Sequence, residues 1–353
     1  MQTGAPFDWH TAAPAEAGFD TGRLEALRAG LAARDTHALF IARDDRIACE
    51  WYAPGWHAAR QHYTASLAKA LVGGVSLLLA LGDGRLDLDD PAARFVPQWA
   101  NEPRKAAITI QHLAAHASGL ADAEQDDLPH DQLPGWKGAF WRRDPDPFTL
   151  ARDAAPVLFP PGSAYAYSNP GMAILAYCVT AAMQTDLRTL LRERVYAPIG
   201  LRDDEWSLGY DTTYHVDGLP LCANWGGGMF TARAAARVGR LLLRRGDWDG
   251  QPLLDAALAH RAALPAGSAP AHSDADPAPA IGLCFWTNAT GVWPEAPRDL
   301  FGGAGAGQQV LLVAPSLGLI AVRNGGPLDD PREATFWGGL RRHVIAPLLD
   351  TIR

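Results

Sequence analysis

Residues 66–81 read SLAKALVGGVSLLLAL, and this stretch decides the fold. It is apolar nearly all round, which predicts a buried central helix that ends at Gly82. Ser66 and Lys69 stand three residues apart, a spacing that places both side chains on one face of a helix. Burial on so apolar a helix lowers the pKa of a lysine, so its amine can be neutral and accept the proton of a serine hydroxyl. We therefore predict that Ser66 is a nucleophile with Lys69 as its partner; the alternative is an incidental serine beside a lysine whose stem lies along apolar surface.

Near each end of the chain, the sequence predicts a hairpin and a helix. The expected elements are a helix over residues 16–33, strands over 38–42 and 46–52 around an Asp44-Asp45 turn, strands over 309–313 and 319–323 around a turn at 315–318, and a final helix that starts at Asp330-Pro331. The simplest arrangement is one sheet that both ends share.

The middle of the chain predicts further helices over residues 172–183, 187–195 and 232–245, the last between a cap at Thr231 and a stop at Gly246. Two stretches predict long loops: residues 121–147, rich in Asp, Pro and Trp, and residues 265–280, low in complexity and expected to be a mobile surface loop.

We therefore predict an α/β (α+β) fold in two parts. Residues 1–62 and 281–353 form a domain with an antiparallel sheet flanked by helices. Residues 63–280 form an inserted, mostly helical region, and the active site lies at the interface between the two parts.

Composition limits the possible partners. The chain has 353 residues, of which 48% are hydrophobic and 20% charged, as in ordinary globular proteins. The formal charge of −8 argues against a nucleic-acid or anionic-membrane partner.

The N-terminus has no basic segment followed by an apolar one, so the sequence as given predicts a cytoplasmic protein, with export after removal of a leader as the alternative. The four cysteines are scattered, which predicts free thiols rather than a disulfide framework or a metal site.

Two shorter motifs follow the serine. Tyr167-Ser168-Asn169 offers a phenol that can handle a proton and an amide that can orient a lysine. Residues 302–307 read GGAGAG before a predicted strand, and glycine there lets a ligand approach the backbone. Taken alone, each motif is more typical of an ordinary structure: a loop tyrosine with a capping asparagine for the first, and a turn for the second.

Together, and in this order, these motifs resemble the serine β-lactamase and penicillin-recognising superfamily. The branch is similar to class C β-lactamase-like esterases, D-aminopeptidases and 6-aminohexanoate-oligomer hydrolases. Four further segments extend the resemblance over almost the whole chain: PAEAGFD at 14–20, ITIQHLAAHASGL at 108–120, Pro161-Gly162, and WGGGM at 225–229. The resemblance implies the β-lactamase-like fold and a serine nucleophile, with neither cofactor nor metal.

Carried over residue by residue, the resemblance assigns roles to the motifs. Ser66 is the acylated serine, Lys69 its partner, Tyr167 the base of the second motif, and Asn169 the amide that orients the lysine. Aligning residues 309–313 with the family's strand places Gly305 on the glycine of the third motif. The second oxyanion N–H, beside that of Ser66, then belongs to Ala306.

The third motif departs from the family pattern. The same alignment places Gly303 where the family usually carries Lys or His, a cation that helps to bind the carboxylate of β-lactams and peptides. Its absence argues against a β-lactamase or D,D-peptidase.

Other chemistry-bearing residues have plainer interpretations. His112 and His116 lie in the segment that resembles a structural part of the family, so we expect structural roles for them. The acidic groups Asp87, Asp89 and Asp90, and Asp126 with Asp127, predict a helix-cap turn and a solvated loop rather than a metal site.

The leading functional hypothesis is a carboxylesterase that acts on small or acyl-chain esters through an acyl-enzyme. Its cleft would be apolar and aromatic, and the residues expected to bind substrate are Trp136, Trp141, Trp225, Gly228 and Gly303. The alternatives are an amide hydrolase of the 6-aminohexanoate-oligomer type, then a β-lactamase or D-peptidase, then a non-catalytic member of the fold. The expected partner is a small-molecule ester or amide; the sequence leaves monomer and homodimer open.

Overall fold

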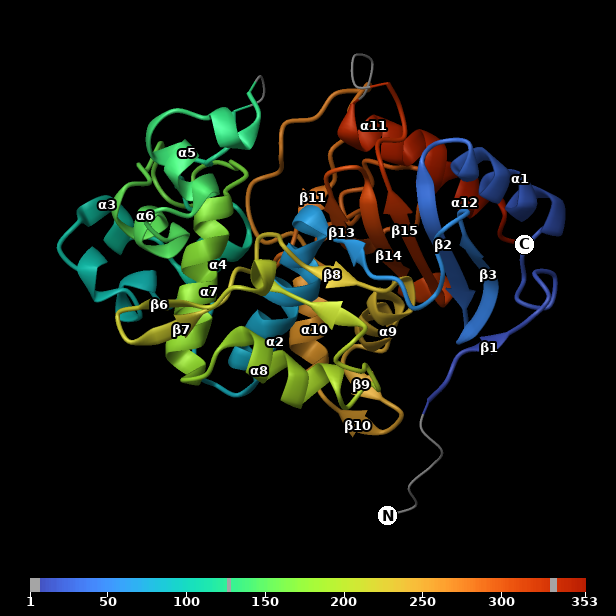
Figure 1. Ribbon diagram of the computed structural model, residues 1–353, viewed down its shortest axis with the longest axis horizontal. Coiled ribbons are helices and arrows are strands. Elements are labelled where there is room, and N and C mark those ends of the chain that lie inside the picture. Colours follow the sequence, from blue (N-terminus) through green and yellow to red (C-terminus); the bar gives the residue numbers. More distant parts are fainter. Residues whose placement is uncertain (1–6, 126–127, 331–334) are drawn as a thin grey trace.

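The computed structural model describes residues 7–125, 128–330 and 335–353, and an eight-stranded sheet lies beside a mostly helical part (Figure 1). In order across the sheet, the strands are β1 (His10–Thr11), β3 (Arg46–Tyr52), β2 (Thr36–Arg43), β15 (Leu319–Gly325), β14 (Gln309–Ala314), β13 (Phe301–Gly305), β12 (Trp286–Thr287) and β11 (Ala280–Ile281). All neighbours are antiparallel except β1 and β3, which run parallel at one edge.

The two ends of the chain meet inside this sheet. β15 pairs with β2, with Leu319 opposite Arg43 and Val322 opposite Phe40, so the prediction of one shared sheet is confirmed. The observed ends of these strands differ from the predicted ones by at most two residues. Asp44 and Asp45, between β2 and β3, have φ of 49° and 63°, as a tight hairpin turn requires.

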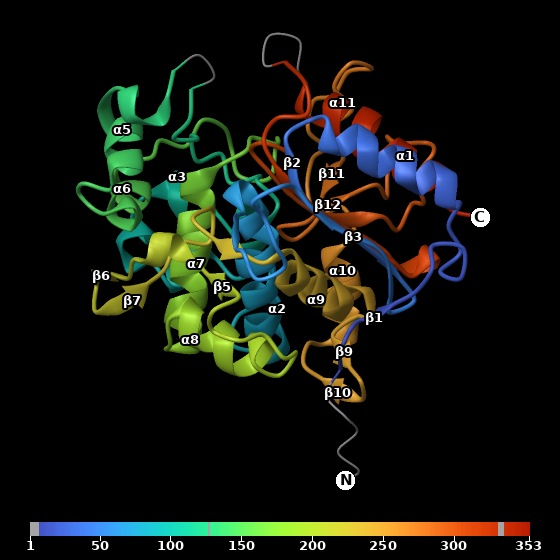
Figure 2. The ribbon, with the colours of Figure 1, turned by 45° about the vertical axis from the view of Figure 1, so that its right-hand side comes forward.

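Helices cover both faces of the sheet (Figures 1 and 2). Alternate strand residues face opposite sides. Leu39 packs with α1 (Thr21–Ala32) and with the C-terminal helices α11 (Phe336–Leu340) and α12 (Ala346–Asp350), whereas Phe40 packs in the larger core on the other face. On that other face, α9 (Ala232–Leu243) lies directly against the sheet: a Cβ at Gly239 would be 2.8 Å from Leu311.

The remaining helices belong to the part of the chain between the sheet strands. They are α2 (Val75–Gly82), α3 (Pro103–Ala106), α4 (Ile110–Ala114), α5 (Gly135–Arg142), α6 (Pro147–Asp153), α7 (Asn169–Met183), α8 (Leu187–Leu191) and α10 (Ala256–Ala262). Three small sheets accompany them: β4 (His62–Tyr63), β8 (Met229–Phe230) and β5 (Trp206–Ser207); β6 (Tyr214–Val216) and β7 (Leu219–Leu221); and β9 (Asp247–Trp248) and β10 (Gln251–Pro252).

The predicted central helix is built from three kinds of turn. A 3₁₀ turn (Ala65–Leu67) leads into a π-helical segment (Lys69–Gly74) and then into α2. π-Helical turns are rare and occur frequently at functional sites. By length and composition Ala65–Gly82 could cross a membrane, with a mean hydropathy of 1.8, yet 89% of it is buried inside the protein. Packing in the protein's own core therefore accounts for its apolar character.

Several boundaries differ from the predictions. α1 begins at Thr21 rather than at residue 16, because Asp20 caps the helix by accepting from Arg23 N and Gly18 before it has φ of 80°. The predicted helix over 187–195 is α8 followed by a π-helical turn (Arg192–Tyr196). The predicted start of the final helix, Pro331, lies outside the described residues.

Of the two segments predicted to be long loops, one contains a helix and the other does not. Residues 121–147 are not structureless, since α5 lies within them: its side chains Trp136 and Phe140, spaced i and i+4, pack against the core. Gly135 and Gly138 concealed this short helix in the sequence. Residues 265–279 contain neither helix nor strand.

Candidate active site

Ser66 stands where β4 turns into the central helix. Ala65, directly before it, has φ of 45°, a left-handed conformation that is uncommon for a residue with a Cβ. Strained backbone of this kind is concentrated at functional sites. The turn brings Ser66 and Lys69 together: Nζ of Lys69 lies 3.0 Å from Oγ of Ser66.

Lys69 is almost completely enclosed, with 5% of its surface exposed. Its Nζ lies 2.7 Å from Oδ1 of Asn169 and 2.8 Å from the carbonyl oxygen of Trp225, in addition to Ser66. Burial lowers the pKa of Lys69 to about 8, although the charges of Glu124 and Asp122 oppose this shift. A neutral amine can give its two N–H groups to Asn169 and Trp225 and turn its lone pair toward the hydroxyl of Ser66.

Tyr167 approaches the serine from the other side. Its hydroxyl lies 2.7 Å from Oγ of Ser66, and its ring centroid lies 4.7 Å from Nζ of Lys69. Burial, followed by the charge of Glu124, raises the pKa of Tyr167 well above its usual value. The phenol is therefore protonated near neutral pH and donates to Ser66. Of the two partners, Lys69 is the one whose pKa suits it to accept the serine proton.

Asn169 connects the lysine to two carboxylates. Its Nδ2 donates to Oδ1 of Asp122 and to Oε1 of Glu124, each at 3.0 Å, and its backbone N donates to Asp122 at 2.8 Å. Burial, followed by the charge of Glu124, raises the pKa of Asp122 to about 6. The sequence reasoning predicted the amide but did not find the carboxylates behind it. The alternating acidic residues Asp122 and Glu124, close after Ser118-Gly119-Leu120, were the available signal.

The end of β13 lies against the backbone of the serine. A Cβ at Gly305 would be 2.8 Å from Ser66 N and 2.4 Å from the Thr64 carbonyl oxygen, so only glycine fits. Within the described residues, the N–H groups of Ser66 and Ala306 have no acceptor. Arg323, buried in β15, donates to the carbonyl oxygens of Gly307 and Gln308 and so fixes the turn that carries Ala306. The two N–H groups can stabilise an oxyanion at this place.

A cavity of about 310 Å³ opens at Ser66. Aromatic and acidic side chains dominate its lining, which consists of Ser66, Glu124, Tyr165, Tyr167, Asp276, Trp286, Ala304, Gly305, Ala306, Phe336 and Trp337. Sequence reasoning missed most of these residues. Tyr165 had a usable signal, because residues two apart on an extended segment face the same side, as Tyr165 and Tyr167 do here.

The five residues predicted to bind substrate are absent from this lining. Trp136 packs against the core, and Trp141 donates from Nε1 to the Ala123 carbonyl oxygen at 2.9 Å. Trp225 is buried between Phe140 and Phe148 and contributes its carbonyl oxygen to Lys69.

The two glycines of this set also serve the backbone around the serine. The Gly228 carbonyl oxygen accepts from Thr64 N at 2.9 Å, next to the turn of Ser66. Gly303 faces the central helix, where a Cβ would be 2.6 Å from Cβ of Ala70. A lysine at position 303 would therefore have no room for its side chain in this packing.

The histidines of the segment 108–120 have structural contacts. Nδ1 of His112 accepts from Thr109 N at 3.2 Å, closing a capping box at α4. Nδ1 of His116 accepts from Ser168 N at 3.2 Å, and burial lowers the pKa of His116 to about 3. Neither histidine hydrogen-bonds to Ser66.

The described residues contain no group of three or more His, Cys, Asp or Glu side chains that could hold a metal ion. Asp90 accepts from Asp87 N and from Arg94, which are contacts of a turn. Asp126 and Asp127 lie outside the described residues. The four cysteines are free, and Cys178, Cys222 and Cys284 are buried.

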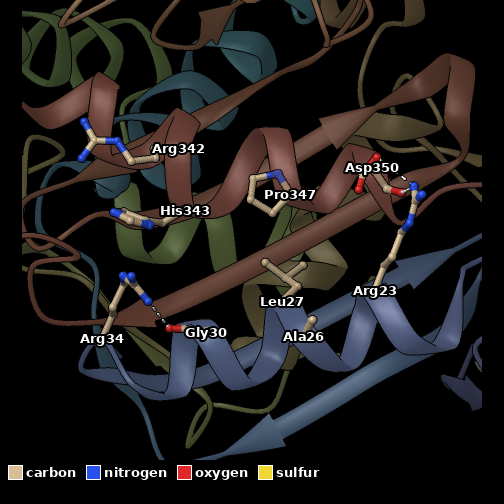
Figure 3. A pocket seen from close by; sticks show the side chains of 9 residues that line it. All are labelled: Arg23, Ala26, Leu27, Gly30, Arg34, Arg342, His343, Pro347 and Asp350. Atoms are coloured by element: carbon tan, nitrogen blue, oxygen red, sulfur yellow. Dashed lines mark hydrogen bonds and ion pairs between the residues drawn. The ribbon is translucent and has the colours of Figure 1, made fainter.

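A second cavity, of about 280 Å³, lies between α1 and the C-terminal helices, on the opposite face of the sheet from the central helix (Figure 3). At one end Arg23 forms an ion pair with Asp350, and at the other Arg34 donates to the Gly30 carbonyl oxygen. Its lining contains neither serine nor cysteine. It therefore offers no serine or cysteine nucleophile, whereas the cavity at Ser66 combines a serine with a lysine and a tyrosine on its hydroxyl and is the candidate active site.

The fold and this site define a serine-hydrolase type of protein with the β-lactamase fold. The Beta-lactamase family model matches residues 24–335, and the chain belongs to this family. Several proteins similar to this chain are named as hydrolases.

Three similar proteins illustrate the range of activities. The 6-aminohexanoate-dimer hydrolase of Paenarthrobacter ureafaciens is 28% identical over 230 residues, which cover 64% of this chain and 56% of that protein. The matched region thus spans little more than half of that relative. A family VIII carboxylesterase superposes with a TM-score of 0.69 at 16% identity, covering 96% of this chain and 99% of the other. A D-stereospecific amidohydrolase from Streptomyces sp. gives a TM-score of 0.65 at 17% identity, covering 91% and 97%. The two structural similarities show the fold alone.

Proposed function

We propose that this protein hydrolyses carboxylic esters through an acyl-enzyme formed on Ser66. The observation that carries the proposal is the placement of Oγ of Ser66 between the Tyr167 hydroxyl at 2.7 Å and Nζ of Lys69 at 3.0 Å. A serine needs a base to become a nucleophile, and Lys69, with a pKa of about 8, supplies one.

The acylation step follows from these contacts. Oγ of Ser66 attacks the ester carbonyl carbon while its proton passes to Nζ of Lys69. The N–H groups of Ser66 and Ala306 stabilise the carbonyl oxygen as it becomes an oxyanion. When the tetrahedral intermediate collapses, the carbon–oxygen bond to the alcohol breaks and the alcohol takes a proton from Lys69 through Tyr167. In deacylation, water attacks the acyl carbon and gives a proton to Lys69. When this second tetrahedral intermediate collapses, the bond between the acyl carbon and Oγ of Ser66 breaks, Oγ takes that proton from Lys69, and the carboxylic acid leaves.

One observation supports amide hydrolysis as a second candidate. An amide nitrogen must be protonated as it leaves, so an amidase needs an additional donor near Tyr167. Tyr165 lines the same cavity, and burial raises its pKa, so the phenol keeps its proton. Among the described residues its hydroxyl has no hydrogen-bond partner. The Tyr165→Phe variant separates the two candidates: an amidase loses amide turnover far more than ester turnover, whereas an esterase is little changed on esters.

The direct test is intact-mass analysis after the protein is mixed with a fluorophosphonate and with p-nitrophenyl esters. We expect one covalent adduct per chain, located by peptide mapping to Ser66, and hydrolysis of p-nitrophenyl butyrate. The Ser66→Ala variant should stay folded by circular dichroism and lose both. Wild-type turnover by Ser66→Ala would show that the nucleophile is another residue.

A further inference from the structure

We propose that the cavity at Ser66 selects substrates that carry an ammonium group, with Glu124 and Asp276 as the residues that determine this specificity. The inference rests on the proposed hydrolase function and names its substrate class. Glu124 comes from the segment after α4 and Asp276 from the segment before β11, and both line the cavity that contains the nucleophile.

In each of the two carboxylates, one oxygen accepts hydrogen bonds from the protein. Oε1 of Glu124 accepts from Nδ2 of Asn169 at 3.0 Å, and Nε2 of His130 lies 3.6 Å away. Oδ1 of Asp276 accepts from the backbone N of Trp337 at 2.7 Å and of Gly338 at 3.0 Å. Within the described part of the chain, the second oxygen of each carboxylate has no partner. Both groups are therefore fixed in position and keep one oxygen for a ligand.

The segment that carries Glu124 is also fixed through its backbone. Nζ of Lys137 donates to the Glu124 carbonyl oxygen at 2.9 Å, and Trp141 donates to that of Ala123. The ring of Trp141 stacks on His130 with 4.0 Å between centroids. α5 thus supports the acidic wall of the cavity, although its tryptophans do not line it.

Aromatic side chains provide the rest of the subsite. Trp286 and Trp337 meet edge to face with centroids 4.7 Å apart, and Phe336 lies 4.9 Å from Trp337. The ring of Tyr165 is also close, with its centroid 6.3 Å from that of Trp286. The electron-rich faces of such rings attract cations, and aromatic walls with carboxylates are typical of ammonium recognition.

The described lining supplies no cation that would offset this negative charge. Among the described residues that line the cavity, none is Lys, Arg or His. Lys69 is buried behind Ser66, with all its hydrogen-bond directions occupied. An anionic substrate would therefore meet repulsion in the cavity, and a cationic one attraction.

The test uses pairs of esters that differ only in charge. Acetylcholine is compared with 3,3-dimethylbutyl acetate, in which carbon replaces the quaternary nitrogen, and p-nitrophenyl 6-aminohexanoate with p-nitrophenyl heptanoate. We expect kcat/KM to favour the cationic member of at least one pair by about tenfold or more, the ratio that one partly desolvated cation–aromatic contact produces. The pair that responds shows whether the ammonium belongs to the alcohol or to the acyl part. Equal kcat/KM within both pairs would overturn the proposal.

Charge-removing variants locate the effect. Glu124→Gln and Asp276→Asn each keep an oxygen that can accept the existing hydrogen bonds, so the ratio of cationic to neutral turnover reports charge rather than folding. We expect both variants to lower this ratio at least threefold, and the exposed Glu193→Gln, which removes the same charge elsewhere, to leave it unchanged. A ratio that persists in both cavity variants would contradict the assignment.

The results also distinguish the two proposals. If the protein cleaves no ester and Ser66 does not react with a fluorophosphonate, the proposed hydrolase function is wrong. If the protein cleaves neutral and cationic esters equally well, only the proposed ammonium subsite is wrong.

Discussion

Nζ of Lys69 lies 2.7 Å from Oδ1 of Asn169, and the orientation of that amide is fixed from behind. Nδ2 of Asn169 donates to both Asp122 and Glu124, so the amide can present only its oxygen to the lysine. The carbonyl oxygen of Trp225 takes a second N–H of Lys69. Because these two acceptors hold two N–H groups of the neutral amine, its lone pair is directed toward the hydroxyl of Ser66. A base that removes the serine proton requires this orientation.

We predict that Lys69→Ala and Tyr167→Phe each lower kcat/KM for p-nitrophenyl butyrate by at least ~10²-fold, the usual scale for a general acid–base group. Because both contact the same serine oxygen, the double variant should be little worse than the more damaged single variant. Losses that multiply would show that the two residues act independently.

We predict that kcat/KM rises with pH and levels off above about 8, because Lys69 accepts the serine proton only in its neutral form and its pKa is about 8. The charge of Glu124 raises this pKa, so Glu124→Gln should move the rise to lower pH. Glu193→Gln provides the control and should leave the profile in place. A shift to higher pH in Glu124→Gln would contradict the electrostatic coupling.

We predict that Gly305→Ala lowers kcat by ~10²-fold or more, the scale for losing an oxyanion donor. The added Cβ would lie 2.4 Å from the Thr64 carbonyl oxygen and must displace either β13 or the turn of Ser66. Gly30→Ala on α1, where a Cβ meets nothing within 4 Å, is the matched control and should keep full activity. Unchanged kcat in Gly305→Ala would exclude the proposed oxyanion site.

The sequence was informative where short-range spacing determines the contact. Ser66 and Lys69 meet because the spacing of three residues on a helix is a local property of the sequence. The strands β2 and β15 follow from short apolar runs next to turn residues. The resemblance to a family added Tyr167 and Asn169, which the spacing alone could not place.

The walls of the cavity could not be predicted in this way, because they depend on contacts distant in sequence. Asp276 lies in a low-complexity stretch that we expected to be a mobile loop, yet its carboxylate accepts from two backbone N–H groups at the start of α11. Trp286 on β12 meets Trp337 on α11 only because the sheet brings them together. The predicted tryptophans failed as lining residues for the same reason: α5 turns Trp136 and Trp141 toward the protein.

Finally, we predict weak or absent turnover of β-lactams. Gly303 supplies no cation, and β13 packs so closely on Ala70 that position 303 has no room for a lysine. A charged hydrogen bond is worth roughly 1.5–3 kcal/mol, so its absence costs one to two decades in kcat/KM. Arg142 and Arg143, at the end of α5, are absent from the described lining, and Arg143 lies 3.6 Å over the ring of Tyr210.

The measurement compares p-nitrophenyl acetate and butyrate, nitrocefin and a linear aminohexanoate dimer on one preparation. Nitrocefin turnover equal to ester turnover in kcat/KM would refute this interpretation of Gly303. The dimer tests both charge effects at once, because it carries an ammonium group at one end and a carboxylate at the other. Attraction of the ammonium by Glu124 and Asp276 favours its binding, whereas nothing in the described lining receives its carboxylate. Dimer cleavage faster than ester cleavage would therefore assign the protein to the amidases and leave the roles of Ser66, Lys69 and Tyr167 unchanged, since both reactions pass through the same acyl-enzyme.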